Sequence, residues 1–336
     1  MIPHVKHSIT CDDETAVLAC LRSGALTQGE AVPAFEQELA NISGAKHCVC
    51  VNSGTAALTL ALRGVGVKVG TWVWTSPISF MATANAVLLA GANVGFTDVD
   101  VRGLVTGWAP RAEVFLPVTL GGNPYDLSLR QRQKTVIVDA CHGPLTLPDG
   151  ATAACFSFHP CKHVACGEGG AVVTNDAEVA ERIRVLRDHG RDAITRRMVR
   201  LSGNCRMPDL NAALGLSQLA RYEDGVKERR RLAALYDAAF AGKVETVPHH
   251  PDSARHLYQV LVEDRDTLRD RLLEQGIGTQ VHYPPIPAEP FYRGMYPGWD
   301  RELANTVRFA AHVLSLPLYP GLTDAEQESV IDALTT

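Results

Sequence analysis

Short apolar runs that suit β-strands alternate with helical patterns through the first half of the sequence, and this alternation limits the fold more than any other feature. The expected strands are at 47–51, 71–75, 94–97, 113–118 and 135–138. Helical patterns lie among them, for example at 56–62 and 81–89. Such alternation favours a parallel sheet with helices on both faces. We therefore predict an α/β fold with a mostly parallel, doubly wound sheet.

The pattern changes after a long charged helix expected at 226–241. A strand is then expected at 256–262, a helix at 265–275, and a strand that starts at Gly276 and runs into the loop of Pro284 and Pro285. A chain of 336 residues is long enough for one large domain and one smaller domain. We predict a large α/β domain at residues 1–240 and a small C-terminal α+β domain at residues 241–336.

Composition excludes several classes of protein. Net charge is −5, so a nucleic-acid partner is not expected. The sequence shows no signal peptide and no apolar run of transmembrane length, which predicts a cytoplasmic protein without a membrane partner. The nine cysteines form no Cys-x-x-Cys pair and the twelve histidines form no helical zinc pair, so reduced thiols and no metal site are expected.

One lysine, Lys162, lies in a stretch at 156–170 that joins an apolar strand-like segment to a glycine-rich turn. Apolar neighbours disfavour the ammonium form and leave the amine available as a nucleophile. The chemistry that suits such an amine is a Schiff base with a carbonyl group. The alternative, from the local sequence alone, is a solvated loop lysine, which is the commoner case.

Asp139 directly follows the strand expected at 135–138. A carboxylate at the end of a buried strand is costly unless it meets a cation or hydrogen-bond donors. The carboxyl ends of strands in open α/β sheets face the ligand crevice. Asp139 is therefore a candidate to hold the protonated ring nitrogen of pyridoxal phosphate, with Lys162 as its partner in the site. The alternative is an aspartate that caps the next turn.

A strand–turn–helix at 47–62 offers a site for an anion. Ser53, Gly54 and Thr55 stand at the junction, where free backbone N–H groups and the positive end of the helix dipole favour a phosphate. Ser53 alone is equally well explained as a helix N-cap, and the two roles are compatible.

Two further features have open interpretations. Phe80 follows the strand at 71–75, where it could stack on a planar ligand or belong to the core. The basic segment at 191–201 is either a solvated loop or a clamp for phosphate or carboxylate.

Six motifs, in this order, resemble those of the DegT/StrS-type sugar aminotransferases. They lie at 24–29, 52–58, 139–142, 157–170, 203–218 and 281–283. Members of that family are pyridoxal phosphate enzymes of fold type I that act on nucleotide-linked keto sugars. The resemblance covers almost the whole chain, and the Ser-Phe-His-Pro-Cys-Lys-His form of the lysine motif is most similar to the pseudaminic-acid-pathway C4 aminotransferases.

The resemblance implies roles for individual residues. Lys162 would hold the cofactor as a Schiff base and move a proton, and Asp139 would pair with the pyridine nitrogen. Further cofactor contacts are implied for Gly54, Thr55, Phe80, His142, Ser157 and Asn204. Phe80 would stack on the ring, His142 would lie near the ring hydroxyl, and Asn204 would come from the other subunit of a homodimer with shared active sites. Substrate contacts are implied for His159, His282 and Tyr283.

The implied reaction moves an amino group from L-glutamate to C4 of a UDP-linked 4-keto-6-deoxy-N-acetylhexosamine. A GDP- or dTDP-linked 4-keto sugar and a 3-keto sugar are the alternatives. Two other classes use the same scaffold. Relatives that remove a sugar hydroxyl carry histidine in place of the lysine, so Lys162 argues against that class. Non-catalytic regulators lose the chemistry, so Lys162 together with Asp139 and the phosphate turn argues against them.

The sequence also departs from the family pattern. The segments between Asp98 and Thr135 and between His189 and Gly203 are shorter than the family leads us to expect. Relatives often carry a histidine after the Pro-Val strand, where this chain has Thr119 after Pro117 and Val118. These departures concern substrate specificity more than the class of reaction.

Overall fold

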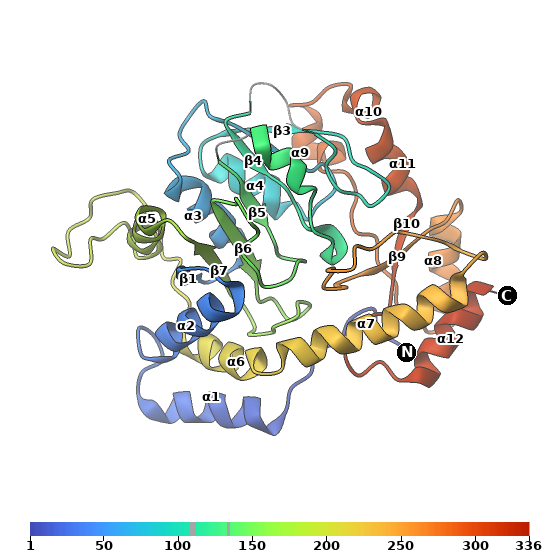
Figure 1. Ribbon diagram of the computed structural model, residues 1–336, viewed down its shortest axis with the longest axis horizontal. Helices are drawn as coiled ribbons and strands as arrows, with labels where there is room; N and C mark the ends of the chain where they lie inside the picture. Colours follow the sequence, from blue (N-terminus) through green and yellow to red (C-terminus); the bar gives the residue numbers. More distant parts are fainter. Residues whose placement is uncertain (108–111, 133–134, 336) are drawn as a thin grey trace.

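The computed structural model describes residues 1–107, 112–132 and 135–335. Figure 1 shows a large layered unit and a smaller unit, with the long helix α7 running beneath both. The sequence departure between Asp98 and Thr135 falls partly outside the described residues. The elements of the first unit are α1 (Cys11–Ser23), α2 (Ala31–Ser43), β1 (His47–Val51), α3 (Gly54–Gly64), β2 (Trp72–Thr75), α4 (Ala82–Leu89), β3 (Asn93–Phe96), β4 (Val114–Leu116), η1 (Leu120–Gly122), η2 (Leu127–Arg132), β5 (Ile137–Asp139), β6 (Ala153–Ser157), β7 (Gly170–Thr174), α5 (Ala177–Arg187) and α6 (Asp209–Leu219). The remaining elements are α7 (Tyr222–Phe240), β8 (Glu245–Thr246), β9 (Tyr258–Leu261), α8 (Arg265–Glu274), η3 (Ile286–Ala288), α9 (Pro290–Arg293), α10 (Trp299–Glu302), α11 (Ala304–His312), β10 (Val313–Leu316) and α12 (Asp324–Thr335).

The strands of the large unit follow one another in the order β3-β2-β4-β5-β6-β7-β1. β2 pairs in parallel with β3 and β4, and β5 pairs in parallel with β6. Parallel bridges from Phe115 to Val136 and from Val118 to Asp139 join β4 to β5. β7 runs antiparallel to both of its neighbours, β6 and β1. The prediction of a mostly parallel sheet is confirmed.

Both faces of this sheet are buried, as a doubly wound fold requires. In β1, Val49 and Val51 pack into the core formed with α3, α4 and α5. The alternate residues Cys48 and Cys50 pack into the opposite core, which contains Phe35 of α2 and residues of α6. Because successive side chains of a strand point to opposite faces, a strand that is apolar throughout lies between two layers of helices.

The strand predicted from Gly276 is wrong. This stretch contains only isolated bridges, at Ile277 and Gln280, and the latter residue exchanges two backbone hydrogen bonds with Ser315 of β10. Gly276 adopts a left-handed conformation (φ +76°) and the following prolines cannot donate to a ladder, so pairing does not extend. The small sheet has the order β10-β9-β8 instead, with antiparallel pairs.

Helix α7 belongs to two cores. Tyr222 and Val226, near its start, pack with α2 and α6. Leu232, Tyr236 and Phe240 pack with β9, β10 and α12 in the core of the small unit. The chain start also reaches that unit, because Ile2 pairs with Ile277. The domain division at residue 240 stays a prediction.

All nine cysteines are free thiols. Among the described residues, no helix combines the length and the apolar character that crossing a membrane requires.

Candidate active site

Asp139 and Ser157 occupy the same edge of the sheet. Asp139 is the last residue of β5 and Ser157 is the last residue of β6, and the two strands are parallel neighbours. The carboxyl ends of parallel strands are where open α/β sheets bind their ligands. The sequence places the candidate site at the carboxyl ends of the strands, and the structure brings Asp139 and Ser157 together at that edge.

The carboxylate of Asp139 is buried and held by neutral donors. The residue is 4% exposed, Thr83 Oγ1 donates to Oδ2 at 2.7 Å, and the backbone N–H of Cys141 donates to Oδ1 at 3.2 Å. The Ser79 hydroxyl lies 2.7 Å from Oγ1 of Thr83, so the two hydroxyls are hydrogen-bonded. Within the described parts of the chain, no basic side chain forms an ion pair with Asp139. A buried carboxylate in this situation suits a positively charged ligand group.

The turn that leads into α3 packs against Ser157. Ser53 is extended (φ −167°) and its side chain accepts the Ala56 N–H at 3.1 Å, which confirms the N-cap. A Cβ on Gly54 would lie 2.8 Å from the Cβ of Ser157, so glycine is required for this approach. Gly54 and Thr55 are the first helical residues, whose N–H groups have no intrahelical partners. The phosphate role of these groups stays a prediction.

Lys162 lies half-buried in the turn after β6, and its backbone N–H donates to the carbonyl of His159 at 2.8 Å. Its charge reaches the surroundings of Asp139. Burial and then Asp139 raise the pKa of the Cys141 thiol well above its usual value, whereas Lys162 opposes that rise. Lys162 and Asp139 therefore both act on the pKa of this thiol. Their pairing around one cofactor stays a prediction.

Phe80 lies at the rim of this region and not in the core. Its side chain is 54% exposed, and its ring lies 6.1 Å from that of Tyr283. The alternative of a buried core phenylalanine is therefore excluded. Stacking on a planar ligand stays a prediction that this exposed face permits.

The second half of the chain brings imidazoles and a phenol to the site. The Oη of Tyr283 lies 3.2 Å from Nε2 of His142, and the rings of His142 and His256 are 4.2 Å apart. His282 Nδ1 lies 2.9 Å from the Oγ of Ser315. Burial and then the charge of Lys162 hold the pKa of His142 well below its usual range. The structure thus joins His142 to the His282–Tyr283 segment, which the sequence assigned to a different ligand.

Two predicted residues lie apart from this group. His159 is exposed, and its Nδ1 lies 3.1 Å from the Sγ of Cys161. Asn204 is exposed too, its carbonyl accepts from Asn52 Nδ2 at 3.3 Å, and its side chain accepts the N–H of Arg206 at 3.2 Å. Asn204 therefore lies beside the phosphate turn of its own chain. Its contact with another subunit, and the substrate contact of His159, stay predictions.

Three residues of the site were missed from sequence. Thr83 binds Asp139, His256 contacts His142, and Gln259 Nε2 donates to the carbonyl of His282 at 3.1 Å. Thr83 lies inside the helix predicted at 81–89, where a threonine carries no sign of what it faces. His256 precedes β9 and Gln259 lies in it, and no local pattern indicates their contacts with His142 and His282.

The basic segment forms an exposed arm, defined here as residues 190–203. It projects from the end of α5 away from the body (Figure 1). A Cβ on Gly190 would lie 1.8 Å from the carbonyl oxygen of Arg200, so the two ends of the arm approach each other at a position that only glycine can occupy. Arg191 pairs with Asp188 at 2.7 Å. In the described chain no ion pair involves the other three arginines, so in a single chain they are solvated. They are Arg196, Arg197 and Arg200.

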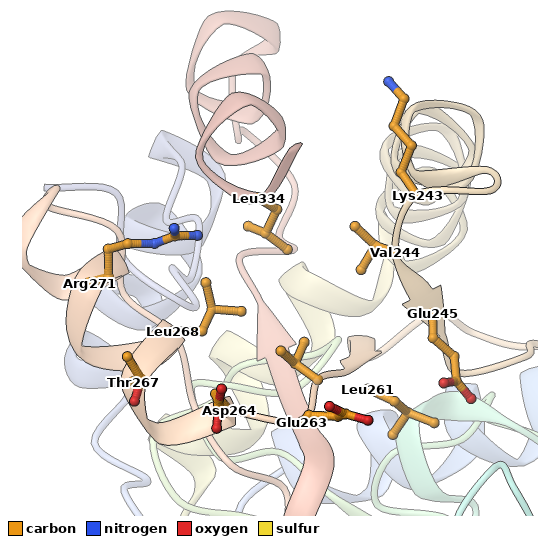
Figure 2. Close-up of a pocket in the computed structure, with 11 residues that line it drawn as sticks. Lys243, Val244, Glu245, Leu261, Glu263, Asp264, Thr267, Leu268, Arg271 and Leu334 are labelled. Carbon is orange, nitrogen blue, oxygen red and sulfur yellow. The ribbon is translucent and has the colours of Figure 1, made fainter. Parts of the chain in front are cut away.

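Cavity size alone does not identify the site. A cavity of about 430 Å³ lies on the small unit, where Val244, Leu268 and Leu334 face inward and Lys243 and Arg271 stand on opposite sides (Figure 2). None of the predicted site residues lines it. Another cavity, of about 320 Å³, is lined by Lys162 together with Lys6, His163, Arg221 and Arg229. Asp224 also lines this cavity, but cations outnumber it, and such a lining suits an anionic ligand beside the lysine.

Comparison with known proteins identifies the family of this chain. The sequence model of the DegT/DnrJ/EryC1/StrS aminotransferase family matches residues 7–335. The spore coat polysaccharide biosynthesis protein SpsC of Bacillus subtilis is 34% identical, over 99% of this chain and 96% of that protein. The UDP-4-amino-4,6-dideoxy-N-acetyl-beta-L-altrosamine transaminase of Campylobacter jejuni is 31% identical, over 99% of this chain and 96% of that protein.

The fold has solved counterparts. The putative sugar aminotransferase Spr1654 of Streptococcus pneumoniae, in its PLP form, superposes with a TM-score of 0.92 at 26% identity and covers 99% of this chain and 97% of that chain. The expectation of a fold-type I architecture is confirmed, and the family is one of pyridoxal phosphate-dependent enzymes. With the family match extending over nearly its whole length, this chain belongs to the DegT/DnrJ/EryC1/StrS aminotransferase family and is a transaminase.

Proposed function

We propose that this chain uses pyridoxal phosphate to move an amino group from L-glutamate to a nucleotide-linked keto sugar. The observation that carries the proposal is the buried Asp139 carboxylate, which meets only neutral donors in the described chain and lies near Lys162. A protonated pyridine nitrogen supplies the positive partner that this carboxylate lacks.

The residues at the edge of the sheet fit the parts of that cofactor. Asp139 would accept the ring N–H, and the N–H groups of Gly54 and Thr55 with the Ser157 hydroxyl would bind the phosphate. Phe80 would cover one face of the ring. When bound, pyridoxal phosphate supplies an electron sink for the carbon that loses or gains the amine.

Lys162 has two tasks in this proposal. Its Nζ would hold the cofactor carbonyl, and as a free amine it would carry a proton to and from the reacting carbon. The carboxylate of Asp139 keeps the ring nitrogen charged while that proton moves. Thr83 and Cys141 hold the carboxylate in place, since both of its oxygens accept a hydrogen bond.

The amino donor is proposed to be L-glutamate because the cavity at Lys162 has a basic lining. Arg229 is 3% exposed, Nη1 donates to two backbone carbonyls, and among the described side chains no carboxylate pairs with it. A dicarboxylate gains from such surroundings, whereas its amide analogue gains less. We expect kcat/KM with L-glutamate to exceed that with L-glutamine at least tenfold, which corresponds to about 1.4 kcal/mol. Equal values would contradict the choice of donor.

The acceptor is proposed to be C4 of a UDP-linked 4-keto-6-deoxy-N-acetylhexosamine, a step on the way to pseudaminic acid. The support is the lysine motif at 159–163 and the 31% identity to the Campylobacter transaminase, whose name specifies a UDP-linked amino sugar. A GDP- or dTDP-linked 4-keto sugar is the second candidate, and a 3-keto sugar is the third.

A panel of matched acceptors tests this assignment. The UDP-, GDP- and dTDP-linked 4-keto sugars and a UDP-linked 3-keto sugar are each incubated with enzyme and L-glutamate, and products are identified by mass spectrometry. We expect the UDP-linked 4-keto sugar to have the highest kcat/KM. If a GDP- or dTDP-linked sugar exceeds it tenfold, a difference of about 1.4 kcal/mol in transition-state binding, the acceptor is wrong while the reaction class stands.

The working enzyme is proposed to be a homodimer with shared active sites. Its support is the arm, whose four large apolar side chains are all highly exposed in the single chain. They are Ile194 (91%), Leu201 (82%), Met198 (70%) and Val199 (59%). Apolar groups gathered on a projecting segment suit a partner surface, and an isologous dimer is the commonest homo-oligomer.

Subunit complementation tests the sharing of sites. Lys162→Ala and Asn204→Ala proteins are each expected to be strongly impaired. In a mixed dimer one site carries both lesions and the other carries neither, so random mixing should restore about a quarter of the parent activity. No recovery in a mixture shown to contain heterodimers would contradict the shared site, as would a fully active monomer in sedimentation.

A further inference from the structure

The cavity of about 320 Å³ beside Lys162 has an excess of positive charge. The carboxylate that lines it belongs to Asp224, which is paired with Lys227 at 3.1 Å. By contrast, no described carboxylate forms an ion pair with Lys6, Lys162 or Arg229, which line the cavity too. Three unpaired cations around one small cavity favour an anionic ligand, because its charge relieves their mutual repulsion.

Arg229 is the cation for which an anion matters most. It is 3% exposed, and its hydrogen bonds in the described chain run from Nη1 to the carbonyls of His256 at 3.3 Å and Leu318 at 2.7 Å. Burial lowers its pKa to about 10, so the guanidinium is still charged at neutral pH. A buried charge that meets only neutral carbonyls is costly, and an anion in the cavity would offset that cost.

A second buried polar group, next to Arg229, lacks a partner. His256 is 6% exposed, and its Nδ1 has no hydrogen bond to any described group. Its ring lies 5.1 Å from that of His163, which lines the cavity. Buried polar groups in folded proteins are nearly always paired, so two such groups beside one cavity indicate that a polar ligand belongs there.

An N-terminal strap, defined here as residues 2–10, brings Lys6 to this cavity. At one end, the backbone N–H of Ile2 donates at 2.7 Å to a carbonyl in the turn after α8. At the other end, the carbonyl of Ser8 accepts from Nε2 of Gln218 in α6 at 2.8 Å. Lys6 lies between these two anchored ends, so the path of the strap holds it at the cavity.

We propose that this cavity is the subsite for the carboxylates of the amino donor, and that Lys6 binds the side-chain carboxylate and thereby determines the choice of donor. The inference rests on the proposed function and deepens it. The α-carboxylate is bonded to the reacting carbon beside Lys162, so the side-chain carboxylate is the group that can reach the strap. A volume of about 320 Å³ is at the lower end of the range for ligand sites, which suits a five-carbon dicarboxylate better than a nucleotide-linked sugar.

The proposed reaction has two halves, and the subsite should serve one of them. The donor gives up its amine and leaves before the sugar receives that amine, so kcat/KM for each substrate reports on its own half. Substitution of Lys6 should therefore change the kinetics with L-glutamate and not the kinetics with the sugar.

Binding of unreactive probes tests the subsite without turnover. Glutarate has the two carboxylates of glutamate and no amine, and UDP has the diphosphate of the proposed acceptor. Both are titrated calorimetrically into full-length protein loaded with pyridoxal phosphate. We expect Lys6→Met to weaken glutarate binding about fivefold, the upper range for one ion pair of an exposed lysine, and to leave the Kd of UDP unchanged. Lys46→Met, at an exposed lysine outside the cavity lining, is the control and should change neither.

Kinetics test the same point in the working enzyme. Lys6→Met should lower kcat/KM for L-glutamate about fivefold and leave kcat/KM for L-glutamine unchanged, so the preference between these donors falls by the same factor. Lys6→Glu should lower the value for L-glutamate by about 25-fold, because repulsion of similar size replaces the attraction. In both variants kcat/KM for the sugar acceptor should equal that of the parent, and circular dichroism should show an unchanged fold.

The possible failures are distinguishable. If Lys6→Met weakens UDP and not glutarate, the cations serve the diphosphate of the acceptor and the inference is wrong. Equal effects on both halves of the reaction, or no effect on glutarate, would also overturn it while the reaction class stands. If no amino acid donates an amine but glutarate binding still depends on Lys6, the proposed function fails and the carboxylate subsite stands.

Discussion

The carboxyl edge of the large sheet and the arm at 190–203 are built in opposite ways. At the edge, Asp139 is 4% exposed and both of its carboxylate oxygens accept hydrogen bonds from the same chain. On the arm, Ile194 is 91% exposed and Leu201 is 82% exposed. The buried carboxylate at the edge has its partners within the chain, whereas Ile194 and Leu201 on the arm lie mostly in solvent.

This difference indicates which parts of the enzyme one chain completes by itself. Positions at the ends of β5 and β6 are determined by sheet pairing, so the residues that would contact the cofactor are arranged before any ligand or partner binds. The arm leaves apolar area in water, which is unfavourable unless another surface covers it. The edge should therefore respond to substitutions as a catalytic centre, and the arm should respond as an interface.

The largest effect is expected at Lys162. Lys162→Ala removes the amine that anchors the cofactor and moves the proton, so turnover should fall by more than about 10⁴-fold, the upper range for a positioned acid–base group. The visible absorbance of the bound cofactor should change as well, while circular dichroism stays unaltered. Lys227→Ala, at an exposed lysine paired with Asp224, is the control and should keep parent activity. Unchanged turnover in Lys162→Ala would remove the basis of the assignment.

The arm should respond next. Replacing both Ile194 and Leu201 with Asp puts two negative charges on the apolar surface of the arm, and an isologous dimer would contain four such substitutions. Each buried aliphatic side chain is worth at least about 1.5 kcal/mol, so the dimer dissociation constant should rise by at least about 10⁴-fold. Sedimentation velocity should then show folded monomers, and activity should fall with the loss of dimer.

The matched control for the arm is Leu273→Asp, which charges an exposed leucine of α8 (56% exposed) far along the chain from the arm. It should leave the sedimentation coefficient unchanged. A double arm variant that sediments as the parent does would show that the arm is not part of the interface.

Asp139→Asn should affect the edge without affecting assembly. The neutral amide keeps the shape of the side chain but cannot hold a ring nitrogen protonated. Loss of a buried charge-assisted contact costs about 2–5 kcal/mol, or roughly 30-fold to 5,000-fold in rate if the transition state feels all of it. The variant should still bind pyridoxal phosphate and still dimerise. Full activity in Asp139→Asn would mean that the carboxylate has another role.

Local sequence was sufficient for the edge of the site and insufficient for its other half. Asp139 and Ser157 are the last residues of β5 and β6, and Gly54 is the first of α3, so their positions follow from the direction of the strands. Thr83 was missed although it lies on the predicted helix α4, because a threonine inside a helix carries no sign of what it faces. The structure shows that its hydroxyl points at Asp139.

The contacts of His142 could not be predicted in this way. Its partners are Gly121 in the turn after β4, Tyr283 in a loop, and His256 before β9. These segments are brought together by packing of the small unit on the large one, a long-range event that leaves no periodic signal in the sequence. The same reason explains β10, which pairs with β9 across the long stretch that holds α8, η3, α9, α10 and α11.

A smaller effect is expected at Thr83, which is 1% exposed. Thr83→Val keeps the shape and removes the hydroxyl that donates to Asp139, a hydrogen bond to a charged group worth about 1.5–3 kcal/mol. Because the Thr83 hydrogen is used on Asp139, Ser79 donates to Thr83, and Ser79→Ala loses only a neutral bond of about 1 kcal/mol. Activity should therefore fall more in Thr83→Val than in Ser79→Ala. The reverse order would show that Thr83 does not orient the carboxylate.

The smallest effect is expected in the pH dependence of the unfolding free energy. It should change on substitution of His163, beside the site, and should not change on substitution of an arginine on the arm. Burial, followed by the charges of Arg229 and Lys162, lowers the pKa of His163 to about 3, although its bond to the Ala254 carbonyl opposes the change. The unfolded chain binds a proton at this residue below about pH 6.5, and the folded chain does not, so stability falls as pH falls below 6.5 and is unaffected above it. His163→Gln should therefore reduce the loss of unfolding free energy between pH 7 and pH 5.5 by about 1 kcal/mol. Urea unfolding at the two pH values measures this difference, with Arg197→Gln on the arm as the control that should retain the parent's pH dependence. An identical pH dependence in His163→Gln and the parent would show that this imidazole is not kept neutral by the fold.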